Sequence, residues 1–239
     1  MKAETVLAKM DEIVDAYAKR TRAFYEPFTP GRARMFVRQH RMNTRQRNSV
    51  LKLRVATNCP DWETKLKIIG ACTQEIVADN EFGGGKPHWE ILEDLGVAIG
   101  MNRNEIRAAK LLPTTEIAWA AWEGLMSNRH WLEGIVANTC AERTNVPGYG
   151  SGEMHDHGWS WVQRKAWAQT FGLKDEQLAF WEVHEAADLE HSNMGWHAVA
   201  TFAERYAMEE AAVRACEINL RVWELYFNGI FEAGDREGA

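Results

Sequence analysis

The chain has 239 residues, of which 46% are hydrophobic and 26% are charged, so it is neither largely disordered nor collagen-like. Its net charge of −6 gives no positive field that would attract nucleic acid or an anionic membrane surface. The four cysteines form no CxxC pair, the first residues are acidic and amphipathic, and no run of about 18 apolar residues occurs. We therefore expect a soluble, cytoplasmic protein without a disulfide framework or a thiolate zinc site.

Apolar residues recur at spacings of three and four residues along almost the whole chain, which predicts an all-α fold. One helix, capped by Asp61 or Thr64, is expected to run to about Glu81 and to end before a Gly-Gly-Gly-Lys-Pro break. The other predicted helices cover residues 4–24, 31–57, 88–99, 103–111, 114–142, 158–171, 175–206 and 208–232. No repeat, low-complexity segment or long linker divides the chain, so we predict one domain over residues 1–239.

The segment between Glu26 and Asp61 contains no acidic residue but eight basic ones. They are Arg32, Arg34, Arg38, Arg41, Arg45, Arg47, Lys52 and Arg54. A solvated helix face is the simplest interpretation, and the alternative is that one arginine points inward and binds a substrate carboxylate. A nucleic-acid groove is disfavoured because exposed aromatic platforms are lacking nearby.

The longest stretch without a helical pattern is residues 143–157, which are rich in glycine and polar side chains. Long loops in compact domains often carry function, so we expect this one near the functional site, although a plain surface connection is the alternative. His155, Asp156 and His157 suggest a metal cluster within it. Adjacent loop residues point in different directions, however, and short polar runs before a helix commonly act as caps, so we favour capping.

His184, Asp188 and His191 share one stripe of a predicted helix. At 100° per residue they lie within about 60° of one another, with an axial spread of about 10 Å. This spread suits two ions bridged by Asp188 better than three direct ligands of one ion. Imidazole and carboxylate donors without thiolate favour iron, manganese or zinc. The alternative is a solvated helix face.

Further donors occur elsewhere in the chain. Glu142 ends another predicted helix, and Glu81 and His88 bracket the glycine-rich break, where the chain can fold back and present both side chains to one point. Three carboxylates and three imidazoles then come from at least three helical segments. Helical bundles use such inward-pointing sets to hold a carboxylate-bridged metal pair.

Two sequence segments carry a resemblance to a known family. IVADNEFGGGKPH contains a carboxylate, a glycine-rich turn and a histidine, and HEAADLEH has a His-x3-Asp-x2-His pattern. With the Glu142 helix, these segments resemble the haem-oxygenase-like non-haem diiron oxidases and oxygenases (the group of CADD, UndA, BesC and AetD), which share the fold of TenA and PqqC. The resemblance extends from about residue 31 to about residue 230. It implies iron ligation by Glu81, His88, Glu142, His184, Asp188 and His191, with Asp79 or Glu75 as alternatives to Glu81.

The resemblance also implies a function. It indicates two iron ions, O2 as co-substrate, and a small amino acid, amine or carboxylic acid as substrate, changed by N-oxygenation or oxidative C–C cleavage in natural-product or cofactor biosynthesis. An external reductant and a homodimer are compatible with it, whereas nucleic acid and membrane are not expected partners. The alternatives are a metal-free enzyme like PqqC or TenA and a non-enzymatic helical interaction protein. Cys72 and Cys140 lie in apolar helical context, which disfavours a TenA-type catalytic cysteine.

Overall fold

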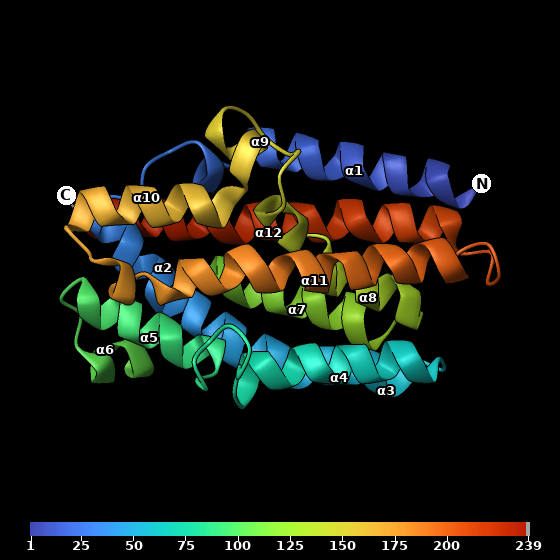
Figure 1. Ribbon diagram of the computed structural model, residues 1–239, viewed down its shortest axis with the longest axis horizontal. Helices are drawn as coiled ribbons and strands as arrows, with labels where there is room; N and C mark the ends of the chain where they lie inside the picture. Colours follow the sequence, from blue (N-terminus) through green and yellow to red (C-terminus); the bar gives the residue numbers. More distant parts are fainter. Residues whose placement is uncertain (238–239) are drawn as a thin grey trace.

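The protein is built of helices, as the sequence predicts (Figure 1). The computed structural model describes residues 1–237, with Asn48 described by its backbone alone. In this part of the chain the β pairing is limited to one isolated bridge between Asp79 and Lys86. The predicted domain of residues 1–239 thus ends with two residues that lie outside the described part.

The α-helices follow one another with short connections. They are α1 (Ala3–Arg20), α2 (Pro30–Met42), α3 (Leu53–Asn58), α4 (Trp62–Ile76), α5 (His88–Ala98), α6 (Arg103–Ala108), α7 (Pro113–Ser127), α8 (Trp131–Thr139), α9 (Glu153–His157), α10 (Trp159–Phe171), α11 (Ala179–Phe202) and α12 (Glu209–Glu237). Short 3-10 turns lie at η1 (Arg22–Phe24), η3 (Glu142–Asn145) and η4 (Asp175–Gln177), and a π-helical segment, η2 (Asn43–Lys52), joins α2 to α3.

The long helix α12 packs against α1, α2, α7 and α8, while α11 packs against α8, α10 and α1 (Figure 1). The helix α1 illustrates why these elements form: Val6, Met10, Val14 and Tyr17 recur at helical spacing and are all fully buried. Aromatic side chains dominate the shared core, and Trp122, Trp167 and Trp181 are among its largest fully buried members. Among the described helices none is both long and apolar enough to span a bilayer.

Several predicted helix boundaries differ from the structure; for example, the predicted helices 4–24, 103–111 and 175–206 correspond to α-helices that end at Arg20, Ala108 and Phe202. The predicted helix 31–57 is α2, η2 and α3 in succession. The predicted helix 114–142 is divided, because His130 caps a new helix by accepting a hydrogen bond from the Leu132 N–H through Nδ1 at 3.2 Å. The third helix starts at the Asp61 cap, as predicted, but ends at Ile76 rather than near residue 81.

The interpretation of the basic segment as a solvated face is wrong for half of its members. Arg32, Arg41, Arg47 and Lys52 are buried. Arg32 pairs with Asp235 and Arg41 pairs with Glu93, so these two guanidinium groups join helices. Arg47 and Lys52 instead reach the polar centre of the protein, because they project from the π-helical segment η2.

Candidate metal centre

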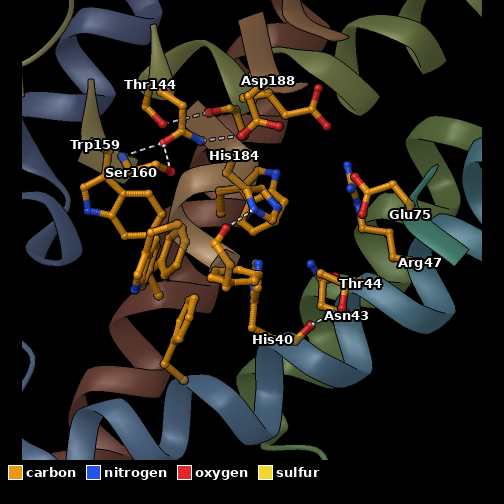
Figure 2. A pocket seen from close by; sticks show the side chains of 18 of the residues that line it. His40, Asn43, Thr44, Arg47, Glu75, Thr144, Trp159, Ser160, His184 and Asp188 are labelled. Carbon is orange, nitrogen blue, oxygen red and sulfur yellow. Dashed lines mark hydrogen bonds between the residues drawn. The ribbon is translucent and has the colours of Figure 1, made fainter. Parts of the chain in front are cut away.

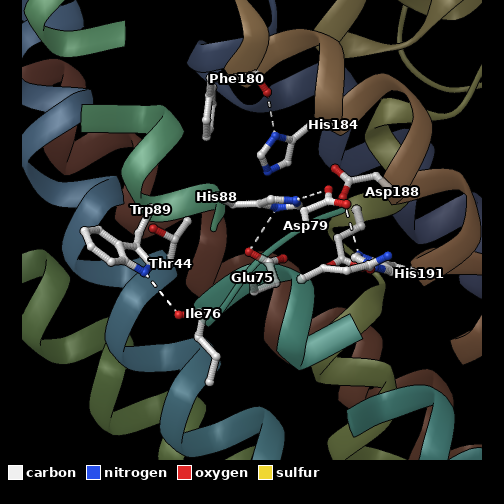
Figure 3. Close-up of polar contacts among 12 residues, drawn as sticks. Thr44, Glu75, Ile76, Asp79, His88, Trp89, Phe180, His184, Asp188 and His191 are labelled. Carbon is white, nitrogen blue, oxygen red and sulfur yellow. Dashed lines mark hydrogen bonds and ion pairs between the residues drawn. The ribbon is translucent and has the colours of Figure 1, made fainter. Parts of the chain in front are cut away.

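A polar cluster lies inside the bundle where α4, α5, α11, η2 and η3 meet. Figure 3 shows His88, His184, Asp188 and His191 gathered around Glu75. The cluster borders a cavity of about 70 Å³, which is lined by the carboxylates of Glu75, Glu142 and Asp188. His184 lines it as well (Figure 2).

The stripe predicted on α11 faces the interior. Asp188 and His191 are each 3% exposed, and His184 is half-buried and lines the cavity. The alternative of a solvated face therefore does not hold for these three residues. The Nδ1 atom of His191 lies 3.9 Å from Oδ1 of Asp188, so the two side chains point to the same region.

Glu81 is not brought to the cluster. Because α4 ends at Ile76, the chain turns early and Asp79 points inward, where its Oδ1 accepts hydrogen bonds from the backbone N–H groups of Glu81 and Phe82. This turn directs the Glu81 side chain to solvent. Glu75, on the last turn of α4 and only 4% exposed, occupies the position expected for Glu81.

Carboxylate and imidazole atoms approach one another closely in the cluster. One potential ligand atom each from Glu75, Glu142 and His191 all lie within 4.8 Å of one another. Nδ1 of His88 lies 3.2 Å from Oε2 of Glu75, and the His88 and His184 rings lie 4.9 Å apart between centroids. The structure thus brings together five of the six predicted donors. Glu75, one of the two predicted alternatives, lies in the place of the sixth, Glu81.

Each of the three imidazoles is held from outside through one ring nitrogen. The carboxylate of Asp79 lies 3.0 Å from Nε2 of His88. The backbone carbonyl of Phe180 lies 2.7 Å from Nδ1 of His184, and Oε1 of Gln74 lies 2.9 Å from Nε2 of His191. Such outer acceptors fix the tautomer and orientation of metal-binding histidines, because the nitrogen that donates its N–H outward leaves the other lone pair facing inward.

Buried ligand atoms that lack a full set of partners face the centre of the cluster. Oε2 of Glu142 and Nδ1 of His191 have no hydrogen-bond partner, and Oε2 of Glu75 and Nδ1 of His88 have only each other, as an ion pair at 3.2 Å. Buried polar atoms are nearly always hydrogen-bonded, so two unsatisfied atoms beside a buried ion pair require an explanation. A metal ion would accept the lone pairs of Glu142 and His191 and, once His88 has lost its proton, those of Glu75 and His88, and the oxygen and nitrogen donor set fits iron.

The carboxylates of the cluster are strongly coupled to one another. Burial raises the pKa of Glu142, and burial together with Glu142 and Glu75 raises the pKa of Asp188 well above its ordinary value. For Glu75, burial acts in the same direction, but the charges of Lys52 and His88 outweigh it and lower the pKa below its ordinary value. Three carboxylates at one buried point therefore need nearby cations.

The imidazoles divide into two kinds. Burial, with a contribution from nearby cationic groups, lowers the pKa of His184 and His191 to about 4, so both are neutral at pH 7 and can bind metal. For His88, burial also acts to lower the pKa, but Glu75 and Asp79 outweigh it and raise the pKa to about 9. His88 is thus a charged imidazolium, protonated on both ring nitrogens, at pH 7 while no metal is bound.

The cavity beside the cluster has apolar walls and a few polar atoms. The walls are formed by Phe36, Trp159, Phe180, Trp181, Trp223 and Phe227. The hydroxyl of Tyr17, Oδ1 of Asn43 and both amide atoms of Asn138 are buried in its lining without hydrogen-bond partners. The Arg47 guanidinium lines the same cavity beside Glu75 (Figure 2). Such convergent polar atoms in an apolar pocket are typical of a small-molecule site.

The predicted loop contributes to the site in part. Thr144 and Asn145 line the cavity, and the Asn145 amide donates a hydrogen bond to Oδ2 of Asp188. His155 and His157 are exposed and lie outside the cluster. The capping role favoured for this run is wrong, because these residues form part of α9 and the following helix α10 starts at the Gly158 cap without a side-chain hydrogen bond. The loop is also held against α1, where Asp15 accepts a hydrogen bond from the Gly150 N–H at 3.0 Å.

Sequence reasoning missed several residues that shape the site. Gln74 and Asn145 carry no signal of their own, because an amide contact with a distant helix leaves no trace in local spacing. The sequence pattern placed Lys52 on a solvated helix face. A regular α-helix would place it about 180° from Asn43, whereas the wider π-helical turns of η2 let both residues face the cluster.

Comparisons with known proteins identify the family and the fold of the chain. The family model described as iron-containing redox enzyme matches residues 34–224. A 4-aminobenzoate synthase of Nitrosomonas europaea is 28% identical over 166 residues, which are 66% of this chain and 61% of that protein, so the chain spans less than two thirds of that relative. A Shewanella denitrificans domain of unknown function with a heme oxygenase-like fold superposes with a TM-score of 0.69 at 15% identity, covering 96% of this chain and 90% of that one, which confirms the predicted fold. The chain belongs to the family of iron-containing redox enzymes.

Proposed function

We propose that the protein is a non-haem diiron oxidase or oxygenase that uses O2 to oxidise a small amino acid, amine or carboxylic acid. The reaction is either N-oxygenation or oxidative C–C cleavage. The observation that carries this proposal is the set of buried, unsatisfied ligand atoms beside three imidazoles that are each oriented by an outer acceptor. We further propose that an external reductant supplies electrons.

The six donors are sufficient for two ions with open coordination positions. They are Glu75, His88, Glu142, His184, Asp188 and His191. Iron held by such donors binds O2 and supplies the electrons for its reduction. The protein contributes orientation, because the acceptors outside the three imidazoles hold each ring in one direction. The asparagine side chain of Asn145 does the same for Asp188.

The cavity supports a small substrate with a carboxylate. A volume of about 70 Å³ holds roughly five to seven water-sized groups at 10–15 Å³ each, which favours a small substrate over a long-chain one. The guanidinium of Arg47 matches a carboxylate, and the amide of Asn138 offers both a donor and an acceptor. The aromatic walls exclude water from the reacting groups. The name of the Nitrosomonas relative is compatible with a biosynthetic role.

Iron counting tests the proposal. Protein reconstituted anaerobically with Fe(II) and then desalted is expected to retain about two irons per chain, and Asp188→Ala or His184→Ala should lose them. Glu75→Gln and Glu81→Gln form a matched pair: the first should lose iron and the second should keep it, because only Glu75 is buried in the cluster. Screening amino acids, amines and carboxylic acids for O2 uptake by the loaded protein then identifies the substrate class.

Other outcomes would overturn the proposal. One iron per chain would remove the diiron assignment, and no bound metal in the wild type would favour a metal-free catalyst on the same scaffold. Iron loss from Glu81→Gln with retention in Glu75→Gln would reverse the assignment of the α4 ligand. Two irons without O2 uptake on any substrate would leave a metal-binding protein without the proposed oxidase activity.

A further inference from the structure

Lys52 places a buried ammonium group against the proposed metal ligands. Its side chain is 1% exposed, and Nζ lies 3.2 Å from Oε1 of Glu75 and 3.3 Å from Oε1 of Glu142. These are two of the three residues whose ligand atoms lie within 4.8 Å of one another. One oxygen of each carboxylate therefore contacts the ammonium; the other oxygen of Glu142 has no hydrogen-bond partner, and the other oxygen of Glu75 lies 3.2 Å from Nδ1 of His88.

A lysine in this position has a physical reason. Burying Glu75 and Glu142 side by side without a cation would be strongly unfavourable, and a paired ammonium offsets this. Two carboxylate oxygens within 3.3 Å of Nζ favour the charged ammonium form of Lys52. An ammonium is a compact point charge on a flexible stem, which resembles a small metal cation more than a planar guanidinium does.

The same position brings Lys52 into conflict with a metal ion. A cation bound between Glu75 and Glu142 would lie only a few ångströms from the ammonium, because both would contact the same two carboxylates. Like charges repel strongly at such distances away from water. A bound ion must therefore share the carboxylates with Lys52 or displace its ammonium from one of them.

We propose that Lys52 is a built-in cation of the metal centre, which holds Glu75 and Glu142 together in the metal-free protein and competes with an incoming ion for them. This inference rests on the proposed function. Lys52 acts here as a positioning residue: it prepares the ligands before the ion arrives and weakens the binding of the ion that takes these two carboxylates. The two ions consequently bind with unequal affinity, and the site at Glu75 and Glu142 fills last.

Charge-removing and charge-keeping substitutions test this role. Lys52→Met removes the ammonium with a side chain of similar length, whereas Lys52→Arg keeps a cation, and Lys174→Met controls for the same change at an exposed position. Anaerobic titration with Fe(II) against a competing chelator measures the affinity for the weaker-bound ion. This affinity is expected to be at least about tenfold higher in Lys52→Met than in the wild type, and close to the wild-type value in Lys52→Arg and Lys174→Met.

Thermal unfolding provides a second readout. Without metal, Lys52→Met should melt at a lower temperature than the wild type, because two buried carboxylates lose their cation, and added Fe(II) should raise its melting temperature by more than it raises that of the wild type. If Lys52→Met folds only with metal, Lys52→Gln, which is neutral but can donate a hydrogen bond, serves for the affinity measurement.

The inference and the proposed function fail in different ways. Wild-type protein that binds no iron refutes the proposed function. Wild-type protein that binds two irons, with Lys52→Met binding them equally or more weakly, refutes the role of Lys52 alone. Lys52→Arg that binds the weaker ion as tightly as Lys52→Met would also refute it, because the effect would then not depend on charge.

Discussion

Asp79 is expected to control metal affinity without contacting the metal. It is fully buried, and its two carboxylate oxygens serve different partners. Oδ2 lies 3.0 Å from Nε2 of His88, while Oδ1 accepts hydrogen bonds from the N–H groups of Glu81 at 3.0 Å and Phe82 at 2.9 Å. One side chain therefore orients an imidazole and also stabilises the turn that follows α4.

Asp79→Asn cannot satisfy both partners. If the amide oxygen faces the two backbone N–H groups, the amide NH2 faces Nε2 of His88, so Nε2 must accept and the proton moves to Nδ1. Nδ1 is the atom that faces Glu75, and a protonated Nδ1 cannot bind a metal. If the amide is reversed, its NH2 opposes two N–H donors and the turn loses its hydrogen bonds.

The expected loss follows from the outer position of Asp79. Removing such a partner typically lowers metal affinity about 10–100-fold, which corresponds to roughly 1.4–2.7 kcal/mol. Anaerobic chelator competition with Fe(II) measures this, and Asp94→Asn is the matched control because Asp94 is a partly exposed carboxylate that pairs with Lys86 and Arg103. Wild-type affinity in Asp79→Asn would refute the assignment of Nδ1 of His88 as a ligand atom.

Three further outcomes are expected. Trp167→Ala should lower the free energy of unfolding by about 3–5 kcal/mol, because Trp167 is fully buried, whereas Trp62→Ala, at a residue 67% exposed, should change it by less than about 0.5 kcal/mol; denaturant titration distinguishes them. Burial, and to a lesser degree the charge of a neighbouring imidazole, lowers the pKa of His40 to about 3. Below about pH 6.5 the unfolded chain therefore binds more protons than the folded one, and the free energy of unfolding should fall from there toward pH 3. His40→Phe should reduce this fall, and a pH profile identical to that of the wild type would show that His40 does not cause it. Backbone hydrogen exchange across residues 181–197 should slow when Fe(II) is added, because buried polar ligands on α11 gain a partner, and unchanged protection would count against metal binding there.

The fold was predictable wherever one regular helix determined the pattern. The predicted helices 88–99 and 158–171 agree with α5 and α10 to within a residue. The boundaries failed where a local capping interaction overrode the apolar spacing. His130 starts a new helix within the predicted segment 114–142, and no apolar periodicity could report a side-chain nitrogen that accepts a backbone hydrogen bond.

The site was predictable to the same extent. His184, Asp188 and His191 lie on one uninterrupted helix, so their convergence follows from helical geometry alone. The choice between Glu75 and Glu81 depended on where α4 ends, and boundaries are the least certain feature of a sequence. The inward position of the Lys52 side chain depended on a π-helical segment, because the larger number of residues per turn changes the face of the helix on which a side chain lies.

The charges at the centre of the bundle argue for a cation-binding site rather than a structural ion-pair network. In a structural network such as that of Glu93, three arginines satisfy one buried carboxylate through five hydrogen bonds. At the cluster, Lys52 contacts one oxygen each of Glu75 and Glu142; the second oxygen of Glu75 has only the His88 imidazole at 3.2 Å, and the second oxygen of Glu142 is buried without a hydrogen bond. The same protein therefore satisfies a buried carboxylate completely where its role is structural, and leaves acceptors open where three oriented imidazoles converge. Open acceptors in such a place are stable only if a further cation completes them.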